Sequence, residues 1–181
     1  MKFYTLALAS LFFCTSAIAG VFEVGGSYSY AHSAYNGGSY TYTKSWATSL
    51  GYYLSEESEV EFSYQDTSSA QFDPGINDLH FEDKVYSLNF LYHFGDDQAS
   101  FKPYFRIGVG QLNRDATGVY EGGFNPPGRL DEVTVIGGAG VKWKLTSRLA
   151  IKSEFTTYLV GGSISTWQDN VTFNVGGSFY F

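Results

Sequence analysis

Charge, cysteine and long apolar runs are all scarce in this sequence. Charged residues make up 16% of its 181 residues, whereas a soluble domain usually carries about 25%. The net charge of −7 argues against nucleic acid as a partner, because a phosphate-binding protein needs a basic patch. The only cysteine, Cys14, lies near the amino terminus, which excludes a disulfide framework.

Residues 1–19 have the three parts of a secretory signal peptide. Lys2 supplies positive charge, residues 4–13 form a short apolar run, and residues 17–19 read Ala-Ile-Ala, which is the small-x-small pattern of a cleavage site. The apolar run is too short for a membrane helix, which needs about 20 residues. We therefore expect residues 1–19 to be removed on export and residues 20–181 to form the mature domain.

The chain is rich in segments where apolar and polar residues alternate with a period of two, which is typical of β-strands. Residues 170–181 show the pattern most clearly, since Val171, Phe173 and Val175 alternate with small or polar residues. Seven earlier segments repeat it. The predicted strands are residues 21–30, 40–54, 59–67, 81–94, 101–113, 132–145, 149–160 and 170–181.

The predicted connections alternate between longer loops and shorter turns. The longer loops are residues 31–39, 68–80, 114–131 and 161–169, and the shorter turns are residues 55–58, 95–100 and 146–148. An antiparallel up-and-down barrel produces this alternation when one rim faces the outside of the cell and the other faces the periplasm.

Two kinds of barrel fit this pattern. A soluble barrel turns its apolar face inward around a ligand, and an outer-membrane barrel turns it outward against lipid. The polar faces favour the second kind, because they carry four acids and four bases at similar heights, and charges in a narrow interior must pair. These residues are Glu23, Glu59, Glu61, Glu154, Arg106, Lys142, Lys144 and Lys152.

We therefore predict an all-β fold, an eight-stranded antiparallel up-and-down transmembrane β-barrel whose interior is filled by side chains. The candidate interior charge network consists of Glu23, Glu61, Arg106, Lys142, Lys152 and Glu154. Two interpretations of this network stay open. The pairs fill the core, or they form a gate in which an exchange of partners opens a thin path for ions.

Two stretches resemble the OmpA/OmpX-like outer membrane β-barrel domain family. Residues 92–95 read Y-H-F-G and residues 101–110 read F-K-P-Y-F-R-I-G-V-G, similar to the family's Y-x-F-G strand end, turn, K-P-Y and G-x-G strand; residues 137–142 look like the same family. The resemblance implies a location in the outer membrane of a Gram-negative bacterium. It also implies that the barrel-assembly machinery reads the last strand through an assembly signal, namely Phe173, Val175, Phe179 and Phe181.

Three functions of different classes remain open. The first is a non-enzymatic structural or surface-interaction role through four extracellular loops, and the second is a small channel for ions or apolar solutes. The third is a lipid A-modifying enzyme, which would need a histidine and a serine within hydrogen-bond reach near the outer leaflet. The histidines are His32, His80 and His93, but the His-x-Ser spacing of lipid A deacylases is absent. We therefore predict no catalytic residue, metal or cofactor, and favour the first function.

Two lysines interrupt the apolar face near the long loops. Lys44 and Lys84 could meet the phosphates of lipopolysaccharide, or simply extend their side chains to the membrane interface. We expect the partners to be outer-membrane lipid, lipopolysaccharide and, during biogenesis, the barrel-assembly machinery. We expect the protein to be a monomer.

Overall fold

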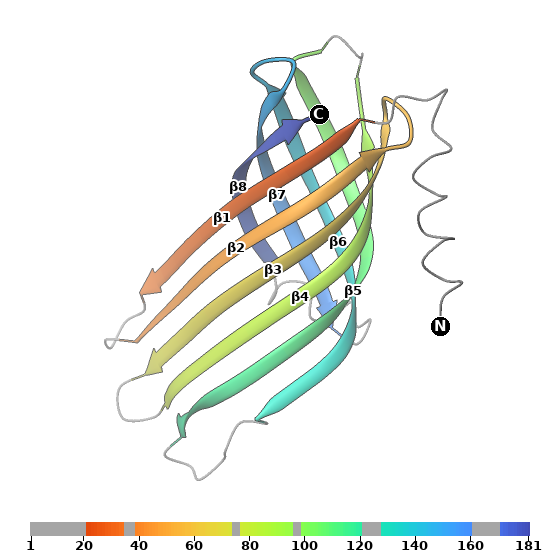
Figure 1. Ribbon diagram of the computed structural model, residues 1–181. Helices are drawn as coiled ribbons and strands as arrows, with labels where there is room; N and C mark the ends of the chain where they lie inside the picture. Colours follow the sequence, from red (N-terminus) through yellow and green to blue (C-terminus); the bar gives the residue numbers. More distant parts are fainter. Residues whose placement is uncertain (1–20, 35–38, 74–76, 96–98, 121–127, 161–170) are drawn as a thin grey trace, which may run out of the picture.

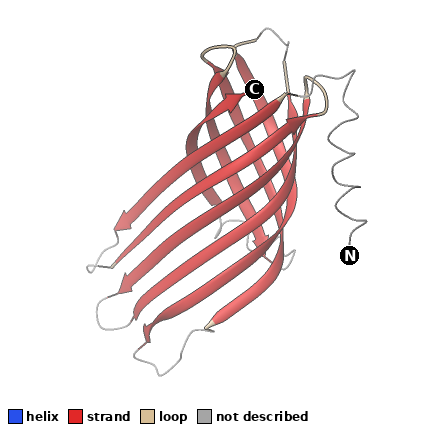
Figure 2. Ribbon diagram, in the orientation of Figure 1, coloured by secondary structure: helices blue, strands red, loops and turns tan. Residues whose placement is uncertain are grey.

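The computed structural model describes residues 21–34, 39–73, 77–95, 99–120, 128–160 and 171–181. The predicted signal peptide, residues 1–19, lies outside the described residues. Within the described ranges no helix is long and apolar enough to cross a membrane, and every regular element drawn in Figure 2 is a strand. The strands are β1 (Phe22–Ala34), β2 (Tyr40–Tyr53), β3 (Ser58–Asp73), β4 (Asn77–His93), β5 (Phe101–Tyr120), β6 (Arg129–Lys144), β7 (Leu149–Val160) and β8 (Val171–Tyr180).

Each strand pairs antiparallel with the next one in the chain, and β8 pairs with β1 to close the barrel (Figure 1). This topology confirms the predicted fold class. Closure satisfies the backbone groups of both end strands, which a membrane requires because lipid offers them no hydrogen bonds. The β1–β8 seam is short, running from Glu23 opposite Tyr180 to Tyr28 opposite Val175.

The strands extend further than predicted at one end of the barrel, which we call the loop end; the opposite end is the turn end. The predicted loops at residues 31–39, 68–80 and 114–131 are partly strand, since β1 reaches Ala34, β3 reaches Asp73 and β5 reaches Tyr120. The predicted alternation of long and short connections is wrong between β3 and β4, which are joined by residues 74–76 alone.

Solvation explains the missed strand ends. A strand that stands in water on both sides has no need of alternating apolar residues, so the period-two signal fades where pairing continues. At the loop end β3 and β4 still pair in register, with Gln71 opposite Leu79. The overhanging ends of β3, β4, β5 and β6, visible in Figure 1, are here called the collar, which comprises residues 66–73, 77–84, 113–120 and 129–132.

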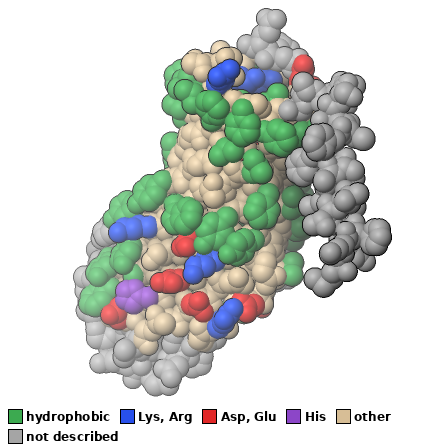
Figure 3. All heavy atoms as spheres, in the orientation of Figure 1, with side chains coloured by type: hydrophobic (Ala, Val, Ile, Leu, Met, Phe, Trp, Pro, Cys, Tyr) green, Lys and Arg blue, Asp and Glu red, His purple; other side chains and the backbone are tan. Residues whose placement is uncertain are grey.

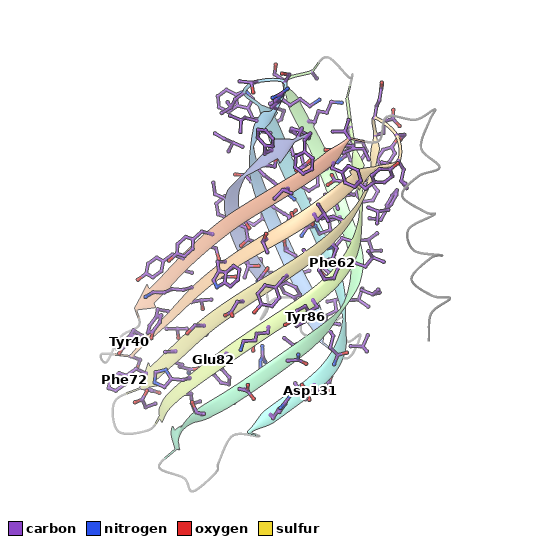
Figure 4. The ribbon with its side chains drawn as sticks, in the orientation of Figure 1. Tyr40, Phe62, Phe72, Glu82, Tyr86 and Asp131 are labelled. Carbon is purple, nitrogen blue, oxygen red and sulfur yellow. The ribbon has the colours of Figure 1, made fainter. Side chains whose placement is uncertain are left out.

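The outer wall of the barrel is apolar and aromatic up to the collar. Ile107 is 56% exposed although it lies in the middle of β5, and Trp46, Tyr64 and Tyr86 form a row with ring centroids 5.3 Å and 4.9 Å apart. Aromatic rows of this kind sit at a membrane interface. Figure 4 shows Phe62 and Tyr86 on the same wall, with Glu82 nearer the loop end. The apolar face therefore points outward, as predicted.

Charged side chains gather beyond this aromatic row, over the collar (Figure 3). One cross-strand row contains Asp66, Lys84, Asn113 and Asp131, and the next contains Ser68, Glu82, Asp115 and Arg129. A charged outer wall is costly in lipid and ordinary in water. The change in composition places the collar outside the hydrocarbon.

Candidate functional site: the charged interior

Lys142 lies at the centre of a hydrogen-bonded cluster in the barrel interior near the turn end. Lys142 of β6 is 2% exposed, and its Nζ donates hydrogen bonds to Glu23 Oε2 at 2.7 Å and to Glu59 Oε2 at 2.8 Å. The Tyr53 hydroxyl donates to Glu23 at 2.8 Å, and Nε2 of His93 lies 2.9 Å from Glu59. We call these five residues the Lys142 cluster. The two extra partners help to satisfy carboxylates that a single ammonium cannot neutralise.

A second cluster lies further along the lumen and is balanced in charge. Arg106 Nη2 lies 2.6 Å from Glu61 Oε1, and Arg106 Nη1 lies 2.9 Å from Glu154 Oε1. Lys152 Nζ lies 3.0 Å from Glu61 Oε2 and 4.0 Å from Glu154 Oε2. We call these four residues the Arg106 cluster. Two cations share two carboxylates, so each charged group touches both groups of the opposite sign.

Tyr104 separates the two clusters and contacts both. Its hydroxyl donates to Glu154 at 2.6 Å, and the Nζ atoms of Lys142 and Lys152 lie 5.7 Å and 5.5 Å from its ring centroid. These distances are within the range of cation–π attraction. The ring fits because Gly140 faces it, since a Cβ at that position would lie 2.6 Å from Tyr104 Cζ. Gly140 therefore serves the packing of the lumen.

The register of the sheet creates the need for these carboxylates. Lys102, Lys142 and Lys152 lie directly opposite one another across β5, β6 and β7, and like charges in such positions repel. Glu23 and Glu59 reach Lys142 from β1 and β3, across the lumen. The barrel must close before the lysines meet these partners, so the clusters couple distant strands.

All six residues of the predicted network face the lumen and take part in ion pairs. The predicted network left out two further charged residues that are buried on the inner wall, Glu59 and Lys102. Glu59 was among the eight predicted interior charges, but the six-residue network omitted it. Lys102, which is 6% exposed, shares the inward face of β5 with Tyr104 and Arg106, and that alternation was the signal that could have found it. Lys144, by contrast, is only half-buried at the end of β6.

Directly above the Arg106 cluster lies an uncharged layer of the lumen, and the next ion pair on the inner wall, Asp83 with Arg114, lies at the level of the collar. Val85, Leu112 and Ile136 form a buried apolar cluster against Tyr158, whose hydroxyl donates to Gln65. Beyond this cluster, among residues of the loop end, lies a cavity of about 130 Å³. At the turn end lies another of about 470 Å³. The two cavities share no lining residue, because the two clusters and the apolar layer lie between them.

The described histidines bond carboxylates. His80 Nε2 lies 3.2 Å from Asp78 Oδ1, and both side chains are more than half exposed on the collar. His93 contacts Glu59 inside the barrel, and no serine bonds either ring among the described residues. The side chain of His32 lies outside what the structure describes. Within the described ranges no group of three or more His, Cys, Asp or Glu residues could hold a metal ion.

The other predicted site residues lie on the outer wall. Lys44 lies opposite Tyr30 and Ser68, with its Nζ 5.6 Å from the Tyr42 ring centroid. Lys84 lies opposite Asp66 and Asn113 in the collar. The residues of the predicted assembly signal are all exposed: Phe173, Val175 and Phe179 lie on the outward side of β8, and Phe181 directly follows the strand.

Comparison with known proteins places this geometry in a family. The model of the OprF membrane domain matches residues 18–179. The crystal structure of the N-terminal β-barrel domain of Pseudomonas aeruginosa OprF is similar with a TM-score of 0.58 and 20% identity, over 90% of this chain and 97% of that one. Ail, the attachment invasion locus protein of Yersinia pestis, solved in complex with the heparin analogue sucrose octasulfate, is similar with a TM-score of 0.53 and 13% identity, over 90% and 97% of the two chains.

At these identities the solved structures show a shared fold and no more. No curated protein matches the sequence. The family match, however, extends over nearly the whole chain, and it agrees with the closed eight-stranded barrel and the apolar outer wall. It also confirms the resemblance to OmpA-like barrels in residues 92–110. The chain is therefore an outer-membrane β-barrel and belongs to the OprF membrane domain family.

Proposed function

We propose that this protein is a structural and surface-interaction protein of the Gram-negative outer membrane, exported by residues 1–19 and without enzymatic activity. The collar is the observation that supports the proposal. Its sheet continues past the aromatic row with a charged outer wall, so it stands in water on the loop end and carries the connections between strands away from lipid. The loop end is then the extracellular side.

The charge of the collar indicates the kind of surface it meets. Its outer wall carries five carboxylates and two permanently charged bases: Asp66, Asp78, Glu82, Asp115, Asp131, Lys84 and Arg129. Arg129 pairs with Asp131 at 3.2 Å, which leaves a surplus of negative charge. Complementary charge guides encounter and selects partners. We propose a partner with a basic surface.

Neutralising the collar tests this role. The variant Glu82→Gln, Asp115→Asn, Asp131→Asn should keep its heat-modifiable barrel, because these side chains lie in water, and should weaken adhesion of producing cells to a polylysine-coated surface. The matched control Glu57→Gln changes an exposed carboxylate at the turn end. Equal adhesion by the collar variant and the control would contradict the surface role. A change in lipid A mass that depends on the wild-type protein would instead support the enzyme.

A second candidate function is a gated ion path, favoured by the Arg106 cluster. Arg106 and Lys152 both touch Glu61 and Glu154, so the pairs can exchange without leaving a carboxylate alone. A void of about 30 Å³ borders the cluster. Planar-bilayer recordings of the wild type, Glu154→Gln and Lys152→Gln test the gate. Conductance that rises in either variant would support it, and three identical silent traces would leave only the packing role.

Two contacts with the membrane complete the proposal. The aromatic outer wall of β8, including Phe173 and Phe179, is proposed as the surface that the barrel-assembly machinery recognises. Lys44 is proposed to bind a phosphate of lipopolysaccharide, because no carboxylate lies directly opposite it. Lys84 is a weaker candidate, since Asp66 lies directly opposite it in the register.

A further inference from the structure

The seam between β1 and β8 joins only part of the length of these two strands. Its last pair is Tyr28 opposite Val175, although β1 continues to Ala34 and β8 begins at Val171. Both strands are described over these additional residues, yet no pairing between them extends there. Figure 1 shows the last part of β1 beside β2, with no strand drawn along its other side. In the described part of the chain, β1 therefore has an open edge at the loop end.

The alternation of the backbone identifies the groups that this edge presents. The N–H of Phe22 donates to the carbonyl oxygen of Phe181 at 3.1 Å, so Phe22 faces β8. In an antiparallel sheet every second residue directs both its N–H and its C=O to the same neighbouring strand. Tyr30 and His32 therefore direct their backbone groups toward β8, where the register gives them no partner among the described residues. Ala31 directs its groups toward β2, opposite which it is paired.

The level of the open edge decides what can reach it. Tyr28, the last paired residue, lies opposite Trp46 of the aromatic row, so the edge begins at the membrane interface and runs toward water. Lipid tails cannot hydrogen-bond to unpaired N–H and C=O groups. Such groups along a strand are a template for pairing with another chain, and peptide-binding proteins use them in this way.

A polar cavity lies directly inside this edge. It is the loop-end cavity of about 130 Å³, and its lining includes Thr43 and Thr172. Thr43 lies opposite Ala31, and Thr172 is the residue of β8 that the continued register would place opposite Ala31. The other uncharged polar residues of the lining near β3 are Gln65, Thr67 and Ser69. Its charged residues, Asp83 and Arg114, bond one another. The cavity therefore suits a small, uncharged, polar side chain.

We propose that the open edge of β1 binds an extended segment of another polypeptide as an added strand, antiparallel like every other pair in this sheet. Main-chain hydrogen bonds to Tyr30 and His32 supply affinity, and the loop-end cavity selects a polar side chain opposite Ala31. The neighbouring side chains of the segment face outward and are apolar, because Tyr30 and Phe173 are exposed there on the outer wall.

This inference rests on the proposed surface role, because the loop end must face the outside of the cell for another polypeptide to reach it. It uses the backbone of β1, however, and not the carboxylates of the collar. The adhesion test of the collar and the test of the open edge can therefore fail independently.

Amide hydrogen exchange followed by NMR tests the edge directly. The ¹⁵N-labelled protein, refolded in a nonionic detergent, receives the capped peptide Lys-Thr-Val-Thr-Val-Thr-Lys, in which the lysines only provide solubility. We expect exchange at the Tyr30 and His32 amides to slow about tenfold when about nine-tenths of the protein is bound, because exchange then occurs from the unbound tenth. The Ala31 amide, which already faces β2, is the internal reference and should not change.

Two matched peptides separate strand addition from other kinds of binding. Methylation of both valine nitrogens keeps the side chains and the charge but removes the N–H groups that face β1, so it should abolish the protection. Replacing the central threonine by leucine should weaken binding by about tenfold, because leucine leaves the polar groups of the cavity without a partner.

A variant of the protein makes the same distinction. Tyr30→Pro removes one N–H of the open edge and places a ring there, and edge strands tolerate proline where that N–H serves no ladder bond. It should not bind the peptide, whereas Tyr30→Ala keeps the N–H and should still bind. The peptide comparison uses the wild type and decides the question even if Tyr30→Pro does not fold.

Three results would overturn the proposal. The first is equal protection by the methylated and the unmethylated peptide, and the second is no protection by either at about 1 mM. The third is protection of the Tyr30 and His32 amides by lipopolysaccharide alone, which would assign the open edge to lipid.

Discussion

The inner and outer walls of this barrel are made by the same eight strands, and both carry lysines under opposite conditions. Lys142 on the inner wall is 2% exposed and bonds two carboxylates. Lys44 on the outer wall is exposed and has an aromatic ring beside it. A shift of one position along a strand moves a side chain from one wall to the other. The difference shows that burial, more than the number of charges, decides how much a charge matters to the fold.

The largest effect should come from breaking the inner wall. Lys142→Ala leaves Glu23 and Glu59 without their shared cation, and removing one partner of a buried ion pair costs about 3–5 kcal/mol. We expect the free energy of unfolding to fall by that amount. Urea unfolding in lipid vesicles, followed by tryptophan fluorescence, measures it.

A triple variant separates the stranded charges from lost packing. Lys142→Met with Glu23→Gln and Glu59→Gln removes the cation together with both carboxylates and keeps similar volumes, so it should be more stable than Lys142→Ala. If the triple variant is as unstable as the single one, the cost lies in packing around Tyr53 and Tyr104 rather than in the unpaired carboxylates.

The next effect tests the outer wall. Ile107→Lys places a charge on the lipid-facing side near the middle of β5, where a lysine costs about 2–4 kcal/mol. The control Asn113→Lys puts the same residue on the same strand and wall but within the collar, and should cost less than about 1 kcal/mol. Equal losses in the two variants would mean that the collar does not lie in water.

An inner-wall ion pair at the level of the collar should behave like a surface pair. Arg114 donates two hydrogen bonds to Asp83, at 2.7 Å and 2.6 Å, but the two side chains are 29% and 17% exposed. We expect Arg114→Ala to cost about 1 kcal/mol. Because salt screens exposed charges, the loss should shrink as salt rises, whereas the loss for Lys142→Ala should not. If the loss of unfolding free energy in Arg114→Ala does not change with salt, the Arg114–Asp83 pair behaves as a buried pair, like those of the Lys142 and Arg106 clusters.

The sequence predicted the walls better than the ends of the strands. The alternation of polar and apolar residues placed Glu61 and Arg106 inside and Ile107 outside. It does so because successive side chains of a strand face the polar lumen and the lipid in turn. The same rule failed at residues 68–73, where both sides of the strand meet water and no contrast exists. The sequence also could not show which interior charges pair, since Lys142 and Glu23 meet only through closure of the barrel and the tilt of its strands.

The smallest effect should distinguish the two outer lysines. Each lies in or beside water, so Lys44→Ala and Lys84→Ala should each change the free energy of unfolding by less than about 0.5 kcal/mol. They should differ in lipopolysaccharide binding, because Asp66 directly opposite Lys84 repels a phosphate, whereas Tyr30 and Ser68 opposite Lys44 do not. Co-purification with lipopolysaccharide should therefore fall more in Lys44→Ala than in Lys84→Ala. If Asp66→Asn then strengthens the association in a Lys84-dependent way, the carboxylate is the cause. If neither lysine variant changes the amount of lipopolysaccharide bound, both side chains only extend to the membrane interface and neither binds a phosphate.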